Sequence, residues 1–166
     1  MSRALAVFAL AVAAAAPALA AQPDPYEALK AMDGHWIATT GSGRTQRIDN
    51  ACARTGRFFV CEQAAGGQPA ALVIFLPRGR EEGKLTFKTQ TLTSAGDPPA
   101  PWRELTINGD TWTWLEPAHG FAPKRRTVVT HSGPDYMRAE IQIEAKDEGK
   151  DNDWRPVSTE TFTRAP

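Results

Sequence analysis

The chain has 166 residues, with 19 Lys and Arg against 19 Asp and Glu, so its formal net charge is zero. This length suggests one domain. A neutral balance offers no basic face for a nucleic acid, so no nucleic-acid partner is expected.

The first 20 residues have the pattern of a secretory signal peptide. Arg3 gives a basic start, an unbroken apolar run covers residues 4–16, and Ala18-Leu19-Ala20 has the small-x-small pattern of a cleavage site. The apolar run is too short to span a bilayer comfortably, which disfavours the alternative of a retained anchor. We therefore expect cleavage after Ala20, a single domain over 21–166, no membrane insertion after leader removal, and location in a bacterial periplasm or outside the cell.

A short helix is predicted ahead of the strands. Asp24 can cap it and Pro25 suits its first position. Leu29 and Met32 share one face, and Gly34 is the expected C-terminal stop. A helix of about two turns is not stable alone, so it must dock on an apolar surface.

From residue 35 onward, apolar residues follow a period of two, with turn residues between the segments. The predicted strands are 35–40, 44–52, 57–64, 70–76, 84–92, 102–107, 111–116, 124–131, 135–145 and 154–163. Asn108-Gly109 is the strongest hairpin signal. The continuous apolar run over 71–76 predicts a strand covered on both faces, followed by a turn at Arg78-Gly79.

This succession of short strands and tight hairpins predicts an all-β fold. The expected architecture is an antiparallel up-and-down β-barrel of about eight to ten strands with a short N-terminal helix. Closure into a barrel removes exposed strand edges. A two-sheet sandwich is the alternative, but the regular hairpin spacing favours the barrel.

Cys52 and Cys61 are the only cysteines. An even count in an exported chain indicates a disulfide. If the two face each other, Gly56 and Arg57 form a two-residue loop, and a glycine in the first loop position suits a type II′ turn. The cysteines then form a non-hydrogen-bonded pair, whose side chains lie close together. A redox or metal site is the alternative, but neither a Cys-x-x-Cys motif nor a nearby histidine supports it.

No motif in the sequence indicates catalysis. His35, His119 and His131 lie on separate segments without metal-ligand spacing, and neither a Gly-x-Ser-x-Gly nor a phosphate-loop motif occurs. His131 ends an apolar strand and is the best candidate for an axial haem ligand, but no cofactor is expected. The acidic segment 147–153 is interpreted as a solvated hairpin loop, with a calcium site as the alternative. We expect neither an enzyme nor a metal site.

The aromatic residues indicate either a packed interior or a lined cavity. Trp112 and Trp114 share one face of a strand, while Trp36 and Phe87 lie on other strands. We predict a partial cavity and take these four residues as candidate ligand-binding residues.

Arg125 and Arg126 are adjacent on one strand, so only one of them can point inward. If Arg126 points inward, Glu160 on the last strand is its candidate partner, and both become candidate ligand-binding residues. The alternative is that both arginines are solvated at the start of the strand.

The sequence Gly34-His35-Trp36 after a short helix, with Arg164 on the last strand, resembles the lipocalin (calycin) pattern. That resemblance implies that Arg164 packs on the ring of Trp36 as a cation–π pair that closes the barrel. A closer resemblance, to an uncharacterised group of exported bacterial lipocalin-like barrels, covers nearly the whole chain after the leader. Its matching elements are Met32 to Trp36, Asp49-x-x-Cys52, Phe59-x-Cys61-Glu62, Leu105-Thr106-Ile107-x-Gly109-x-x-Trp112 and Arg126-Thr127. It implies the fold and export, and it implies no reaction.

Together these features predict an exported, monomeric, non-enzymatic barrel that binds a small, largely apolar molecule. The alternative is an envelope structural or protein-interaction domain whose barrel core is filled with side chains.

Overall fold

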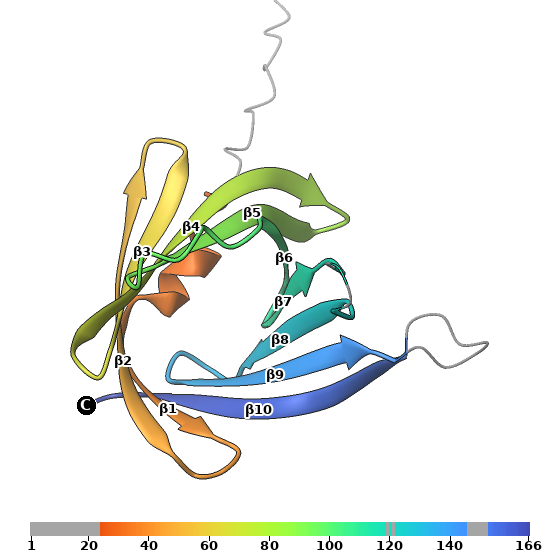
Figure 1. Ribbon diagram of the computed structural model, residues 1–166. Coiled ribbons are helices and arrows are strands. Elements are labelled where there is room, and N and C mark those ends of the chain that lie inside the picture. Colours follow the sequence, from red (N-terminus) through yellow and green to blue (C-terminus); the bar gives the residue numbers. More distant parts are fainter. Residues whose placement is uncertain (1–23, 119, 121, 146–152) are drawn as a thin grey trace, which may run out of the picture.

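A computed structural model of the chain describes residues 24–118, 120, 122–145 and 153–166 (Figure 1). In chain order the elements are η1 (Ala28–Met32), β1 (Gly34–Thr40), β2 (Thr45–Thr55), β3 (Phe58–Ala65), β4 (Gln68–Glu81), β5 (Lys84–Thr93), β6 (Arg103–Asn108), β7 (Thr111–Glu116), β8 (Arg125–His131), β9 (Tyr136–Glu144) and β10 (Trp154–Arg164). Each strand pairs with its neighbours along the chain, and β10 pairs with β1 to form a closed antiparallel barrel. The predicted up-and-down barrel is confirmed, and the sandwich alternative is wrong.

The predicted end of the fourth strand is wrong. Gly79 lies in β4 and not in a turn, because a bulge between Pro77 and Gly79 lets the strand continue to Glu81. The hairpin turn lies at Glu82 and Gly83, which both have positive φ, 48° and 81°. Positive φ at both loop positions is the conformation of a type I′ turn, whose twist matches the strands.

The predicted cover on both faces of this strand is also wrong. Phe75 is fully buried inside the barrel, and Val73 packs against the same core. The alternate residues Leu72, Ile74 and Leu76 lie on the outer face and are half-buried. An apolar run therefore serves one buried face and one partly solvated face.

The cysteine hairpin forms in the predicted register. Cys52 and Cys61 are paired and bonded, with their Cα atoms 4.1 Å apart. Gly56 has a φ of 57°, while Arg57 does not have a positive φ. This combination fits the predicted type II′ turn and excludes type I′, which needs positive φ at both positions.

The helical segment is shorter than predicted and of another type. η1 is a single 3₁₀ turn of five residues, and the side chain of Asp24 accepts a hydrogen bond from the backbone N–H of Tyr26 (3.0 Å). Asp33, with extended backbone, ends η1, so Gly34 is the first residue of β1 and not the helix stop. Short helices often take 3₁₀ geometry, which needs fewer residues per turn.

η1 lies inside the ring of strands and closes one half of the barrel (Figure 1). Its Leu29 is completely buried, and the preceding Tyr26 is 3% exposed. The buried residues packed around them are Phe59, Cys61, Phe75, Phe87, Leu105, Ile107 and Trp112. This half of the barrel is therefore a filled hydrophobic core.

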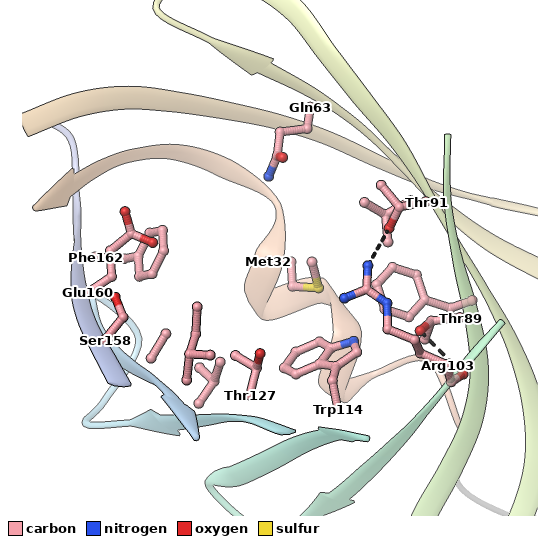
Figure 2. A pocket seen from close by; sticks show the side chains of 15 residues that line it. Met32, Gln63, Thr89, Thr91, Arg103, Trp114, Thr127, Ser158, Glu160 and Phe162 are labelled. Carbon is pink, nitrogen blue, oxygen red and sulfur yellow. Dashed lines mark hydrogen bonds between the residues drawn. The ribbon is translucent and has the colours of Figure 1, made fainter. Parts of the chain in front are cut away.

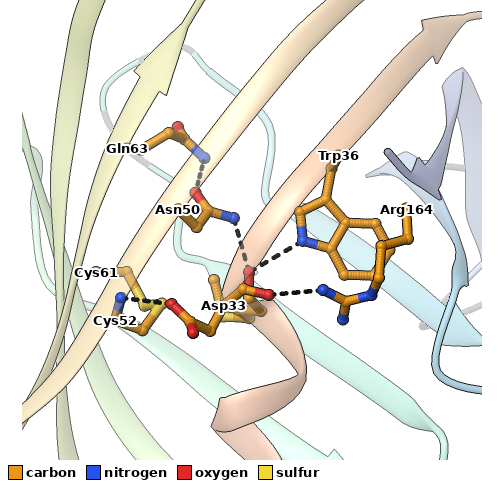
Figure 3. Close-up of a disulfide and its surroundings, with 8 residues drawn as sticks. Asp33, Trp36, Asn50, Cys52, Cys61, Gln63 and Arg164 are labelled. Atoms are coloured by element: carbon orange, nitrogen blue, oxygen red, sulfur yellow. Dashed lines mark hydrogen bonds between the residues drawn. A yellow bond between two sulfur atoms is a disulfide. The ribbon is translucent and has the colours of Figure 1, made fainter. Parts of the chain in front are cut away.

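The end of η1 is tied to the barrel wall by its last carbonyl groups (Figure 3). The Met32 carbonyl accepts hydrogen bonds from the Trp36 indole (3.1 Å) and the Asn50 amide (2.9 Å). Asp33 accepts two hydrogen bonds: its carboxylate accepts one from the backbone N–H of Cys52, and its backbone carbonyl accepts one from the Arg164 guanidinium. These contacts join η1 to β1, β2 and β10.

Trp36 and Arg164 lie directly opposite each other on β1 and β10. The guanidinium carbon of Arg164 lies 4.2 Å from the centroid of the Trp36 ring, so the expected cation–π pair is present. Gly34 belongs to the same arrangement, because its φ is 103° and a Cβ there would lie 2.6 Å from the Arg164 guanidinium. Glycine is thus favoured at this position by the backbone conformation, and a larger residue would displace the Arg164 guanidinium.

Candidate ligand-binding cavity

The half of the barrel away from η1 contains a cavity of about 430 Å³ (Figure 2). Its walls come from η1 and from eight strands, β3 to β10. The lining residues are Met32, Gln63, Val73, Phe75, Thr89, Thr91, Arg103, Trp114, Thr127, Val129, Ala139, Ile141, Ser158, Glu160 and Phe162. Met32 and Phe75 belong to or adjoin the filled core, so the cavity begins where the core ends.

The candidate tryptophans lie at different depths. Trp114 lines the main cavity. Trp36 and Trp112 line a smaller adjoining cavity of about 140 Å³, which Trp114 also borders. The Trp112 and Trp114 rings are neighbours, with centroids 5.9 Å apart. Trp114 and Phe162 are thus the aromatic residues that line both spaces.

Phe87 is not a cavity residue, so its assignment as a ligand-binding residue is wrong. Its side chain is completely buried in the filled core, next to the Tyr26 ring. Phe87 and Thr89 point inward from the same strand, but only Thr89 reaches the level of the cavity. The sequence could assign the inward face, but it could not assign the depth at which the core ends.

Arg126 lies on the outer face of the barrel, so its proposed contact with Glu160 is wrong. Its guanidinium packs on the Trp154 ring, 4.3 Å from the centroid, and donates a hydrogen bond to Gln142. Burial at this contact lowers the pKa of Arg126 from its usual value, although an arginine remains charged at neutral pH. Thr127, the next residue, is the one that points into the cavity.

The inward-pointing arginine is Arg103, which the sequence interpretation missed. It begins β6 and shares a face with Leu105 and Ile107, both buried in the core. Its guanidinium donates to the hydroxyl of Thr91 (3.3 Å), and its backbone carbonyl accepts from Thr89 (3.5 Å). The alternation Arg103, Leu105, Ile107 was the signal that could have identified it.

Glu160 lines the cavity as predicted, but its surroundings differ from the prediction. It pairs with Thr40 at the end of β1 farthest from η1, and Ser158, two residues earlier on β10, also lines the cavity. Figure 2 shows Glu160 and Arg103 on opposite sides of the cavity. The strand order agrees, since three strands separate β6 from β10 on one side and five on the other.

Among the described residues that line the cavity, only Arg103 and Glu160 are charged. Within the part of the chain that the structure describes, no carboxylate lies within 4.0 Å of the Arg103 guanidinium, and no side-chain cation lies within that distance of Glu160. The other polar groups of the wall are neutral, namely Gln63, Thr89, Thr91, Thr127 and Ser158. The described lining of the cavity therefore carries one positive and one negative group on facing walls, and its other residues are neutral.

His131, considered above as a haem ligand, lies outside this cavity. Its ring stacks near Trp112, with centroids 4.4 Å apart, and its Nε2 is buried with no hydrogen-bond partner among the described residues. Burial lowers the pKa of His131, and this effect exceeds the opposing influence of Asp110. His131 is thus packed as a neutral ring beside the core.

Another histidine lies in a polar group on the outer surface. His35 Nδ1 lies 2.6 Å from Asp49 Oδ1, and Arg47 donates to the same oxygen (2.8 Å). Hydrogen bonds from Arg47 and then from His35 hold the pKa of Asp49 below its usual value. Over the described ranges, no three His, Cys, Asp or Glu side chains lie together as a metal site requires. His119 and most of the acidic loop, residues 146–152, lie outside the described residues.

A comparison with models of known protein families gives no match, and a comparison with curated proteins gives none. Within the described part of the chain, no helix is long and apolar enough to cross a membrane. The arguments for function therefore rest on the geometry of the barrel.

Proposed function

We propose that this protein is an exported, non-enzymatic, lipocalin-like barrel that binds a small, largely apolar molecule in its cavity. The observation that carries the proposal is the division of the interior: one half is a filled core, and the other is a cavity of about 430 Å³. A volume of this size is within the range of small-molecule sites. Export is supported by the disulfide, which persists in oxidising compartments.

The wall of the cavity suits an apolar skeleton. Trp114, Val129, Ile141 and Phe162 provide large apolar surfaces on four different strands. Burying such surface against a ligand is favourable by about 25 cal/mol per Å². The seven polar or charged residues of the wall are of the kind that orient a ligand in its site.

Two experiments test this proposal. Native mass spectrometry of the protein purified from its natural source should reveal a bound molecule that is released on denaturation. Titration with a neutral brominated alkanol, which quenches the tryptophans it contacts, should then quench Trp114. Trp114→Phe should reduce the quenching, while Trp154→Phe on the outer face should not. Absence of both a retained mass and saturable quenching would contradict the proposal.

A second candidate function, protein interaction in the cell envelope, is favoured by the outer face of β3, β4 and β5. Apolar side chains lie side by side there: Phe58, Val60, Leu72, Ile74, Leu76 and Leu92. Phe58 is 41% exposed, and Val60 pairs with Ile74 as Leu72 pairs with Leu92. Contiguous apolar surface of this kind is often an interaction site. If this face binds a partner protein, Ile74→Lys should abolish that interaction in cells, while binding of the probe in the cavity should be unchanged.

A further inference from the structure

We propose that the natural ligand is dipolar, with an acidic group and a basic group at opposite ends of an apolar skeleton. The acidic group would contact Arg103, and the basic group would contact Glu160. This inference rests on the proposed function, because it names the chemical class of the molecule bound in the same cavity.

The first argument is the hydrogen-bonding capacity that the protein leaves unused. An arginine has five N–H donors in a planar fork that matches a carboxylate. Among the described residues, the Arg103 side chain donates one hydrogen bond, to Thr91. That bond fixes the guanidinium against the wall and leaves the rest of its donors for a ligand. A carboxylate or another planar anion is the group that fits them.

The second argument concerns Glu160 on the facing wall. Its carboxylate can accept several hydrogen bonds, and no described side chain donates to it within hydrogen-bonding distance. Ser158 and Phe162 flank it on the same inward face of β10, so its surroundings are only partly polar. An ammonium group is the natural partner for an ionised carboxylate in such a place.

The third argument is the cost of the alternatives. A neutral apolar molecule that filled the cavity would displace water from both charged groups without forming hydrogen bonds to them, which is unfavourable for each ion. A molecule with only an acidic group would satisfy Arg103 and leave Glu160 desolvated, and a simple amine would do the reverse. A dipolar molecule satisfies both, and its own dipole aligns with the field between the two walls.

The arrangement also predicts selectivity for length. The positions of Arg103 and Glu160 are fixed by β6 and β10, which belong to one closed sheet. The distance between the two ligand charges must therefore match the gap between the walls. A ligand that is too short reaches one charge only, and one that is too long must bend or leave one charge outside.

The test uses the disulfide-bonded protein and a length series of linear α,ω-amino acids. The carboxylic acid, the amine and the alcohol of each chain length serve as comparison compounds. Affinities are measured by calorimetry and by displacement of the neutral dye N-phenylnaphthylamine. At one chain length, the amino acid should bind about tenfold more tightly than either singly charged compound, the factor expected for one charged hydrogen-bonded pair.

Variants assign the two ends of the ligand. In Arg103→Gln the amino acid should bind no more tightly than the amine, and in Glu160→Gln no more tightly than the acid. Arg103→Lys keeps the charge and should retain part of the preference. Glu104→Gln and Arg126→Gln are the matched controls, since both residues point to the outer face, and they should leave all affinities unchanged. Thermal unfolding verifies that each variant is folded.

The outcomes separate the ligand class from the proposed function. If the dye binds but the amino acids bind no more tightly than the alcohols, the dipolar ligand is wrong and the apolar binding function stands. If the amino acids bind and the dye does not, the dipolar class stands and the largely apolar description is wrong. If neither binds, both proposals are overturned.

Discussion

Replacement of Ala139 by leucine tests whether the half of the barrel away from η1 contains a cavity. Ala139 points inward from β9, is 8% exposed and lines the cavity. Leucine adds three carbon atoms, whose complete burial would contribute at most about 2.4 kcal/mol at about 0.8 kcal/mol per carbon. Because the cavity opens to solvent, the expected gain in the free energy of unfolding is between zero and about 1 kcal/mol.

Ala38 provides the matched control. It points inward from β1, is 4% exposed and does not line the cavity. Ala38 lines neither cavity, and adding the same three carbons at a buried position without free space costs about 1–3 kcal/mol. Urea unfolding should therefore show that Ala38→Leu is destabilised and that Ala139→Leu is not, while dye binding is weakened only in Ala139→Leu. Equal loss of stability in both variants would refute the free space beside Ala139.

Three further predictions concern the barrel wall and the filled half. Reduction of the Cys52–Cys61 bond should lower the free energy of unfolding by about 2.5–3 kcal/mol, the chain-entropy estimate for a closed loop of about ten residues; urea curves with and without dithiothreitol measure this, and superimposable curves would contradict it. Since burial lowers the pKa of His131, the unfolded chain binds its proton first, so stability should fall as the pH drops below the unfolded pKa of about 6.5 and until the lower folded pKa is reached; His131→Phe should show less of this loss in unfolding curves collected across that range, and an identical pH profile would argue against it. Replacement of Arg164 by Gln removes the contact with the Trp36 ring and should cost about 1–2 kcal/mol, since a partly exposed cation–π pair and hydrogen bonds from a charged group are lost together. Thermal unfolding measures this loss, and an unchanged melting temperature would count against a role of Arg164 in closing the barrel.

The strand pattern could be predicted from the sequence because both its signals are local. Alternation assigns the two faces of each strand, and turn residues such as Gly56 fix the hairpins. The register of Cys52 and Cys61 followed from the same local signals. The turn predicted at Gly79 was wrong because glycine occurs in both bulges and turns, and only the pairing with the partner strand distinguishes the two.

The candidate site was harder to predict because it depends on depth and on which of two neighbours points inward. Arg126 was considered because it stands beside Arg125, and the apolar residues that follow it on β8 gave no clear alternation. Arg103 had the clearer pattern, since Leu105 and Ile107 fix its face. Phe87 was taken as a cavity residue, but where the core ends depends on the volume of η1 and on the packing of distant strands.

The position of η1 also restricts the route of a bound molecule. Leu29 and Tyr26 stop one end of the barrel, and the carbonyls of Met32 and Asp33 are fastened to three strands. If the cavity binds a ligand as proposed, that ligand would enter and leave at the end of the barrel opposite η1, so the part that enters last would leave first. A ligand longer than the cavity would extend into the solvent, where another protein could bind its exposed end while the barrel stays closed.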